Sequence, residues 1–424
     1  MFKAAELLQE QPLCDRCLGR MFARLGLGLS NKERGRAFKI LIMMSLHRRI
    51  KSGDKEAEEG FKRLAPRLGG VASKLYEELF QEELKVEECS ICGDKLEPLI
   101  GEASVKASEL VARYGARSFL VGCRVPRRIV EAEEALKLRH GLIYAESIGN
   151  EVKREVGKRV KEMAGVEPEF MEPDMVVLID FETGAVEPHP LPIMFRGRYW
   201  KLGRRISQSR WVLSGDRRKY PFSVEEALEP AARLAGASRA ILHAAGREDV
   251  DARMLGTGRP MIVELKMPAR LDVDPKEAED AVNGSQGLVK VALEERASRR
   301  DVRFYKSERA RTRKIYRALF IVEEDVGEDR VAELERIFIN LRVRQQTPLR
   351  VLHRRADVVR YRKVFSVRLR RLAPRIFEAL IDSEGGLYIK ELISGDGGRT
   401  EPSFSSILGT QATCLELDVI YVEL

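Results

Sequence analysis

The segment "AGREDVDARMLGTGRP" (Ala245–Pro260) concentrates charges of both signs between glycines. The stretch "ILHAAGRED" runs from a predicted apolar strand into this segment, so its acids would lie at a strand end, where functional residues are often found. The glycines allow the backbone to turn sharply or to approach another group closely. The segment is therefore a salt-bridged turn of little energetic weight, a glycosidase-like pair of acids, or a loop that holds one catalytic carboxylate. The seven residues from Arg247 to Arg253 hold most of these charges: Arg247, Glu248, Asp249, Asp251 and Arg253.

The composition indicates a soluble globular protein. The chain has 424 residues, of which 33% are charged and 44% hydrophobic, and this length accommodates two or three domains with their own cores. No apolar run reaches the roughly 18 residues of a membrane helix, and the first residues lack the layout of a signal peptide. We therefore expect no membrane association and a cytoplasmic location.

The net charge of +9 is modest, but the cations are clustered. Phe195–Trp211 carries six cations and no acid among aromatic residues, Ser307–Arg317 carries five cations and one acid, and Leu349–Arg375 is a longer basic run with one acid. Cations pair with phosphates and aromatic rings stack on unpaired bases, so these runs predict RNA binding. The alternative is a solvated face of a heat-adapted protein. The predicted RNA contacts are Arg198, Lys201, Arg204, Arg313, Lys314, Arg354, Arg355 and Arg399.

The chain divides by pattern into three regions. Residues 1–100 are predicted to be mostly helical, and Ser30 with Glu33 has the spacing of a capping box. Residues 101–192 place the helical pattern "SIGNEVKREVGKRVKEMAG" between the strand patterns "RSFLVGCRV" and "PDMVVLIDF". The proline-rich segment Val186–Ile193 is the predicted linker to residues 193–424. In that last region, strands are predicted at Met261–Leu265, Ala318–Val322 and Leu417–Val422.

Four of the six cysteines form two C-x-x-C pairs, separated by 71 residues. Two such pairs supply four thiolates for one tetrahedral zinc ion, which would join the two ends of a helical insertion. Four thiolate ligands leave no open position, so the zinc would be structural. Two disulfides or a redox-active pair are the alternatives. The predicted ligands are Cys14, Cys17, Cys89 and Cys92.

Two distant segments carry residues that suit one carboxylate and one base. Tyr316, in the cationic segment "RKIYRALF", is an aromatic residue that either stacks on a base lifted out of RNA or lies at the edge of the core. Tyr388 and Lys390, in "GGLYIKEL", are predicted to share one face of a strand. A lysine there either keeps a loop aspartate ionised or is solvated.

These segments resemble, in order, the three catalytic motifs of pseudouridine synthases. "GRED" resembles the first motif, whose aspartate is indispensable, and this maps to Asp249, with Asp251 as the second candidate. "KIYRALF" resembles the second motif, which implies that Tyr316 stacks on the target base. "GLYIKEL" resembles the third motif, which implies that Tyr388 contacts the substrate and that Lys390 pairs with the aspartate. Lys390 stands where several families have arginine, so its contact would be a point charge and not a fork.

Further segments of the sequence match one group within the pseudouridine synthases. "AGREDVDARMLGTGRP", "QQTPLRVLHRRADVVR" and "GDGGRTEPS", with the cysteine pairs, resemble the archaeal and eukaryotic tRNA pseudouridine synthases that carry a zinc-and-THUMP accessory domain. The resemblance implies an α+β fold: a catalytic domain at 193–424 with a mixed, largely antiparallel sheet flanked by helices and loops, and an α/β accessory part made of a zinc-binding region (1–100) and a THUMP-like region (101–192). It also implies a monomer.

The implied reaction is isomerisation of uridine to pseudouridine at T-loop position 54, position 55 or both in tRNA. It needs no catalytic cofactor, because it involves neither net redox change nor hydrolysis. Asp249 would attack C1′ of the ribose or abstract the 2′ proton, on a flipped-out base, with Arg247 and Arg253 at the substrate or as scaffold. A methyltransferase would need a glycine-rich cofactor loop, which the sequence lacks. A zinc-dependent RNA chaperone would leave Asp249, Tyr316 and Lys390 unexplained, and a nucleosidase would release free base.

Overall fold

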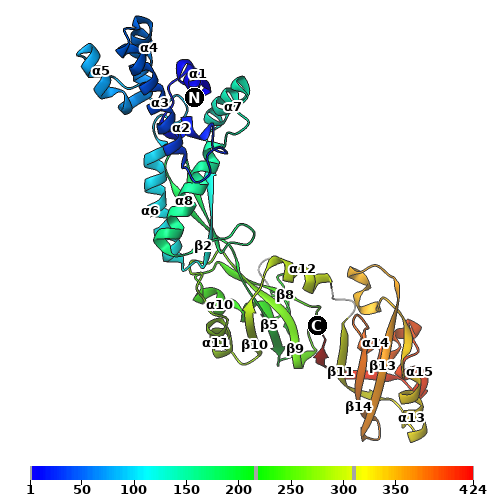
Figure 1. Cartoon of the computed structure of the whole chain (residues 1–424). Helices are drawn as coiled ribbons and strands as arrows, with labels where there is room; N and C mark the ends of the chain where they lie inside the picture. The colour runs from blue at the N-terminus through cyan, green and yellow to red at the C-terminus, as the bar shows by residue number, and fades with distance from the viewer. Residues whose placement is uncertain (1, 214–217, 308–311, 424) are drawn as a thin grey trace. The chain divides into compact units, whose positions relative to one another are not determined.

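The computed structural model of the chain describes residues 2–213, 218–307 and 312–423, and it divides into two compact units, Met1–Pro190 and Leu191–Leu424 (Figure 1). The division falls inside the proline-rich segment predicted as a linker. The linker prediction was wrong for the first five residues, because Val186–Pro190 forms strand β4 and pairs with its neighbour β3. Among the described residues, no helix combines the length and the apolar character that crossing a membrane requires.

The first half of unit 1 is helical, as its pattern predicts. Ser30 and Glu33 form the expected capping box at the start of a 21-residue helix, in which each residue satisfies a backbone donor of the other. Only Ser52–Asp54 separate this helix from the next one, which Asp54 caps by accepting a hydrogen bond from the N–H of Ala57. The helices are α1 (Phe2–Glu10), α2 (Asp15–Arg20), α3 (Asn31–Lys51), α4 (Lys55–Leu68), η1 (Gly69–Val71) and α5 (Ser73–Phe80).

The second half of unit 1 is a four-stranded sheet with helices packed on it. The strand order is β2-β1-β3-β4, with β1 parallel to β2 and β3, and β4 antiparallel to β3. Val152, Val156 and Val160 recur along one face of α8 and are fully buried, which positions that helix against the sheet. The elements are α6 (Leu96–Tyr114), β1 (Ser118–Arg124), α7 (Arg127–His140), α8 (Ile148–Ala164), β2 (Glu167–Pro168), β3 (Met175–Asp180) and β4 (Val186–Pro190).

Unit 2 is built on one large sheet with the order β10-β5-β9-β16-β11-β14-β13-β12-β15, and β8 also pairs with β9. All of these pairs are antiparallel except that between β9 and β16. The fold is therefore α+β with a mixed, largely antiparallel sheet, as expected. The strands are β5 (Ile193–Lys201), β8 (Arg239–Ala244), β9 (Arg253–Lys266), β10 (Val289–Arg296), β11 (Arg313–Val322), β12 (Leu341–Gln346), β13 (Val359–Ala373), β14 (Ile376–Glu384), β15 (Thr400–Glu401) and β16 (Ala412–Val422).

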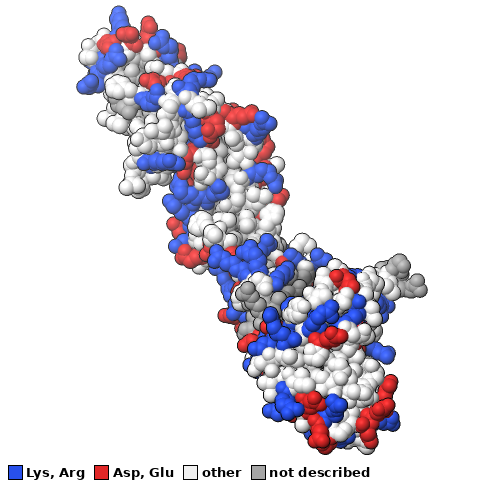
Figure 2. Space-filling view, turned by 90° about the vertical axis from the view of Figure 1, so that its right-hand side faces the viewer, with Lys and Arg blue, Asp and Glu red and all other residues white. Residues whose placement is uncertain are grey.

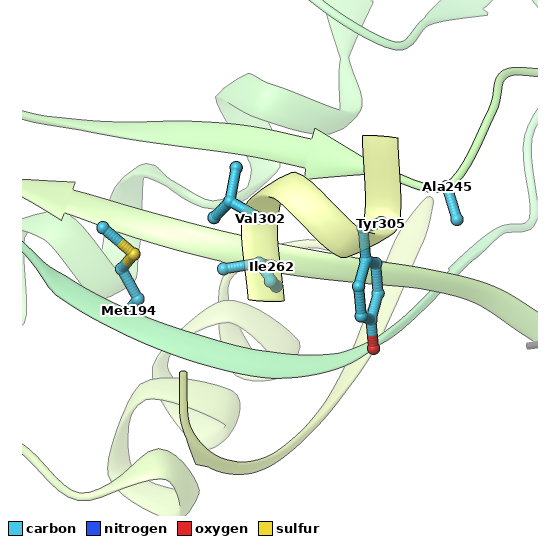
Figure 3. Packing of buried hydrophobic residues seen from close by; sticks show 5 residues of the cluster. All are labelled: Met194, Ala245, Ile262, Val302 and Tyr305. Carbon is cyan, nitrogen blue, oxygen red and sulfur yellow. The ribbon is translucent and has the colours of Figure 1, made fainter. Parts of the chain in front are cut away.

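Short helices cover this sheet and its connections. Val302 and Tyr305, three residues apart on α12, pack on Met194 of β5, Ile262 of β9 and Ala245 beyond β8 (Figure 3). A small pair, β6 (Ile206–Ser207) and β7 (Phe222–Ser223), lies outside the main sheet. The helices are α9 (Val224–Ala227), α10 (Glu229–Leu234), α11 (Pro275–Ser285), α12 (Arg299–Ser307), α13 (Glu328–Ile337), η4 (Leu349–Arg354), α14 (Ile389–Ser394), η5 (Asp396–Gly398) and α15 (Phe404–Leu408).

The strand predicted around Tyr388 and Lys390 was wrong. Tyr388 is the N-cap of helix α14, and Lys390 is its second residue, so the two side chains do not share a strand face. Ile389, Leu392 and Ile393 are buried. Their i, i+3, i+4 spacing is that of a helix, and the alternation assumed for a strand used only two residues of the segment.

Candidate active site

The acidic loop connects β8 to β9 and is tightly held at its first glycine. Gly246 has φ +88°, and a Cβ there would lie 3.1 Å from Nη1 of Arg259. The side-chain amide of Gln208 donates to the carbonyl oxygen of Gly246 at 2.9 Å. Only glycine fits this position without displacing the arginine, so the loop leaves the strand in one defined direction.

Glu248 points inward and anchors the loop. Its carboxylate accepts hydrogen bonds from Arg259 at 2.8 Å and from the Tyr199 hydroxyl at 2.9 Å, and Lys201 lies 3.5 Å away. Burial favours the neutral acid, but the charges of Arg259 and Lys201 outweigh it and hold the pKa of Glu248 below its ordinary value. All of these partners are protein groups, so the carboxylate of Glu248 is engaged within the protein and supports the loop.

The prediction that Lys201 contacts RNA was wrong. Its side chain is buried, and its ammonium group donates to the backbone carbonyls of Ile206, Asp249 and Val250 at 3.0 to 3.2 Å. Three carbonyls and Glu248 surround this cation, so it is unavailable to a phosphate. It instead fixes the backbone on which Asp249 stands.

Asp249 and Asp251 have different partners. Asp249 is half-buried, with Arg350 at 2.9 Å and Lys390 at 3.9 Å from its carboxylate. Asp251 is exposed and takes the closer contact with Lys390, at 2.5 Å. That lysine outweighs the effect of burial and lowers the pKa of Asp251. The lysine is therefore shared between the two acids, and an arginine outside the three motifs contacts Asp249.

A cavity of about 590 Å³ opens beside Asp249. Eight arginine and lysine side chains line it against two acids, so it suits a polyanion. Asp249, Tyr316, Tyr388 and Arg247 all reach its wall, whereas Asp251, Lys390 and Arg253 do not. The lining cations are Arg247, Arg259, Lys314, Arg350, Arg354, Arg355, Arg360 and Arg362.

The two tyrosines line the cavity from different elements, Tyr316 from β11 and Tyr388 from the start of α14. Tyr316 lies in β11 between Val419 of β16 and Ile381 of β14, and burial raises its pKa to about 12. Its hydroxyl is therefore protonated at neutral pH. The Tyr388 hydroxyl accepts from Arg355 at 3.2 Å, and the Gln345 amide bonds both the N–H and the carbonyl of Tyr388.

Several predicted RNA contacts, and the predicted substrate contact Arg253, are engaged within the protein. Arg204 and Arg253 both pair with Asp418, at 2.9 and 2.7 Å. Arg399 donates to the carbonyl of Thr347 and pairs with Asp357. Arg313 pairs with Asp382, and Arg198 makes long contacts to carbonyls at 3.3 Å and beyond. Arg354 and Arg355 are exposed and Lys314 is buried, but all three line the cavity. Residues 308–311 of the basic run Ser307–Arg317 lie outside the described residues.

The surface charge is mixed on the face that Figure 2 shows. On the face in Figure 2, lysines and arginines alternate with acidic residues and white surface, and no uniformly basic sheet of charge appears there. The concentration of cations at the cavity is therefore more informative than the net charge.

Arg350 is the main residue that the sequence reasoning missed. It lies inside the quoted segment "QQTPLRVLHRRADVVR", but three other arginines lie in the same segment. Its partners, Asp249 and Glu391, are 101 and 41 residues away. No local pattern distinguishes an arginine that contacts such partners from one that faces solvent.

The four cysteines of the two C-x-x-C pairs meet in unit 1. Their sulfur atoms all lie within 4.8 Å of one another, and all six cysteines of the chain are free thiols. Cys14 caps helix α2, and the carbonyl of Pro12 accepts from both the N–H and the hydroxyl of Ser90, which holds the two pairs together. The arrangement suits a metal ion and contradicts the alternative of two disulfides.

Comparison with known proteins matches both units. The family description "Pus10, C-terminal" matches residues 194–423, and "Pus10 THUMP domain, archaeal" matches residues 104–180. The protein named tRNA pseudouridine synthase Pus10 from Aeropyrum pernix is 46% identical over 99% of this chain and 96% of the relative. The protein of the same name from Ignisphaera aggregans is 40% identical over 99% and 98%. A solved Cbf5-Nop10-Gar1 complex aligns with 52% of this chain and 49% of its own at 18% identity and a TM-score of 0.30, which is too partial to support an inference.

Proposed function

The chain belongs to the Pus10 family of tRNA pseudouridine synthases, which are isomerases, and from this premise we propose that it converts uridine to pseudouridine in the T-loop of tRNA, at position 54, position 55 or both. The observation that carries the proposal is Asp249, a half-buried carboxylate with adjacent cations, on the wall of a cavity lined by eight arginines and lysines. A cytoplasmic location and a monomeric state are part of the same proposal.

In the proposed reaction, the target uridine leaves its stack and enters the cavity. Asp249 is the catalytic carboxylate, acting at C1′ or on the 2′ proton. The N1–C1′ bond breaks, the base rotates and C5 bonds to C1′, while C5 loses a proton and N1 gains one. The net reaction therefore needs no external oxidant or reductant. The ring of Tyr316 lies on the base, and Tyr388 forms the opposite wall. The exposed cations Arg247, Arg354 and Arg355 bind the phosphates that flank the target.

The test is to map pseudouridine in a tRNA transcript incubated with the protein. Asp249→Asn should lower the single-turnover rate by on the order of 10⁴-fold, with tRNA affinity unchanged, because an uncharged isostere removes no phosphate contact. Asp251→Asn, two residues further along the same loop, is the matched control. If Asp251→Asn is inactive and Asp249→Asn is active, the carboxylate is misassigned. If the active protein modifies a tRNA whose positions 54 and 55 are cytidine, the T-loop assignment is wrong.

We also propose that Cys14, Cys17, Cys89 and Cys92 hold one structural zinc ion. The support is the donor set: four thiols within 4.8 Å match the tetrahedral sulfur coordination that zinc prefers. Elemental analysis of the purified protein should give one zinc per chain, and Cys89→Ser should lose it and lower the stability of unit 1. Because the ion is far in the chain from the catalytic loop, activity of the folded fraction should persist. A stable protein without metal would contradict the assignment.

A further inference from the structure

Arg350 connects two carboxylates that come from different elements. Its guanidinium lies 2.9 Å from Asp249 through Nη2, and its Nε donates to Glu391 of α14 at 2.6 Å. The same group lies 5.9 Å from the ring centre of Tyr388, within the range of a cation–π contact. One planar side chain therefore touches the loop acid, the first turn of α14 and the aromatic wall of the cavity.

The turn that carries Arg350 is itself rigidly held. The N–H of Leu349 donates to Asp396 at 3.0 Å, and Val351 is buried on the other side of the arginine. Just before this turn, Gln345 of β12 bonds the backbone of Tyr388 in both directions, at 2.8 and 3.0 Å. Arg350 and the segment of Tyr388 are thus attached to the same strand, and the arginine reaches Asp249 from a fixed base.

Glu391 gives the arginine its orientation. Its side chain is almost fully buried, and both its oxygens face Arg350, at 2.6 and 3.5 Å. Burial disfavours the guanidinium charge, but the bond with Glu391 and the charge of Asp249 reverse this and hold the pKa of Arg350 above its ordinary value. Because the buried carboxylate of Glu391 pairs with Arg350, it holds the guanidinium in one orientation. Arg350 therefore presents Nη2 to Asp249.

Lys390 interacts with Asp249 more weakly than Arg350 does. It is 3.9 Å from Asp249 and 2.5 Å from Asp251, and a lysine contributes one point charge where an arginine contributes a planar fork. The distances separate the two cations by function: Lys390 holds Asp251, and Arg350 holds Asp249.

We infer that Arg350, oriented by Glu391, is the positioning residue of the catalytic carboxylate: it fixes Asp249 toward the cavity, in place of the motif-three lysine. The inference rests on the proposed function, since it takes Asp249 to be the catalytic group. Displacing a reacting group by about 1 Å commonly costs on the order of 100-fold in rate, so the arginine should act on the chemical step and not on tRNA binding.

The test separates rate from affinity. Arg350→Ala should lower the single-turnover rate at saturating tRNA by roughly 100-fold, whereas the Kd for tRNA and its salt dependence stay unchanged. Arg350→Lys should recover only part of the rate. Arg270→Ala is the matched control, because Arg270 also joins two carboxylates, Asp272 at 2.7 Å and Glu277 at 3.2 Å, with similar exposure but away from the cavity. That variant should retain the normal rate.

A phosphate contact would give the opposite pattern. Losing one would raise Kd and reduce the slope of log Kd against log salt by about 0.7–0.9, with the saturated rate preserved, and this result would overturn the inference. A rate within twofold of the unmodified protein would overturn it as well.

Glu391→Gln tests the same idea without removing the arginine. It should lower the rate by about 10-fold alone and add nothing in the Arg350→Ala background, because the two residues act through one contact. This variant and Arg350→Lys decide the matter if Arg350→Ala does not fold, and full activity of both would overturn the inference. An inactive Asp249→Asn with an active Arg350→Ala rejects this inference alone, whereas an active Asp249→Asn rejects the proposed catalytic residue.

Discussion

Two regions of unit 2 surround an aspartate with cations, but only one of them is open. Asp418 contacts three arginines, Arg204, Arg253 and Arg317, at 2.7 to 2.9 Å, and its side chain is 2% exposed. Asp249 has one arginine at 2.9 Å and a lysine at 3.9 Å, and its side chain is 37% exposed on a cavity. The first carboxylate has no capacity left for a substrate, whereas the second keeps an accessible side.

Local charge composition therefore does not distinguish the proposed catalytic acid, Asp249, from a structural one. Arg253 belongs to the same acidic loop as Asp249, yet its side chain pairs with the distant Asp418. What differs is the number of donors that converge on the carboxylate and whether a solvent-filled space adjoins it. Asp418 is therefore a structural junction between β9, β11 and β16, the strands that Arg253, Arg317 and Asp418 occupy.

Removing the Asp418 carboxylate should give the largest effect among the tests of this contrast. Asp418→Ala should lower the free energy of unfolding by about 2 kcal/mol in urea titrations, because three arginines lose their common partner. The value lies below that for a fully buried pair, since the arginines are 25–45% exposed and can hydrate. The rate of pseudouridine formation by the folded fraction should change little.

The control for that measurement is Asp272→Ala, which breaks an exposed pair with Arg270. Its unfolding free energy should fall by no more than about 1 kcal/mol. Equal losses for Asp418→Ala and Asp272→Ala would mean that the convergence of three arginines adds nothing, and the distinction between the two regions would fail.

Acid should produce a smaller effect of the same origin. Burial opposes the charge of Asp418, but Arg253 and Arg317 outweigh it and lower the pKa of this carboxyl to about 2, against about 3.9 in an unfolded chain. The folded state therefore binds fewer protons between these values, so the contribution is complete above about pH 4 and is lost as the pH falls toward 2.

Urea titrations of the unmodified protein and of Asp418→Asn at pH 6 and pH 3 measure this contribution. The stability difference between the two proteins should narrow by about 1 kcal/mol at the lower pH. A difference that is the same at both pH values would show that Asp418 is not the group that titrates.

The sequence predicted the features that depend on local pattern. The strands that contain Met261–Leu265, Ala318–Val322 and Leu417–Val422 form as β9, β11 and β16, because each is an apolar run of strand length. The meeting of the four cysteines could be predicted, because two C-x-x-C pairs indicate a shared metal site even across a gap of 71 residues. Asp249 and Tyr316 reach one cavity, in keeping with the order of the motifs.

The sequence did not predict where each cation points. Lys201 and Arg204 lie in the same basic run as Arg198, but their partners, Asp249 and Asp418, are 48 and 214 residues away. Arg350 is indistinguishable from its arginine neighbours until Glu391 and Asp249 are placed around it. A cation's role depends on which acids the fold brings within about 4 Å of it, and that information is absent from a local segment.

The position of strand β16 in the chain determines when the cavity can form during synthesis. It lies between β9 and β11 in the sheet, so it joins the half that carries Asp249 to the half that carries Tyr316 and Arg350. It also follows every other strand of that sheet in the chain, so a ribosome makes both halves before it makes their connection. We expect a nascent chain that ends before Ala412 to carry all of these side chains without the strand that links the two halves of the sheet, so that the cavity forms only when β16 emerges.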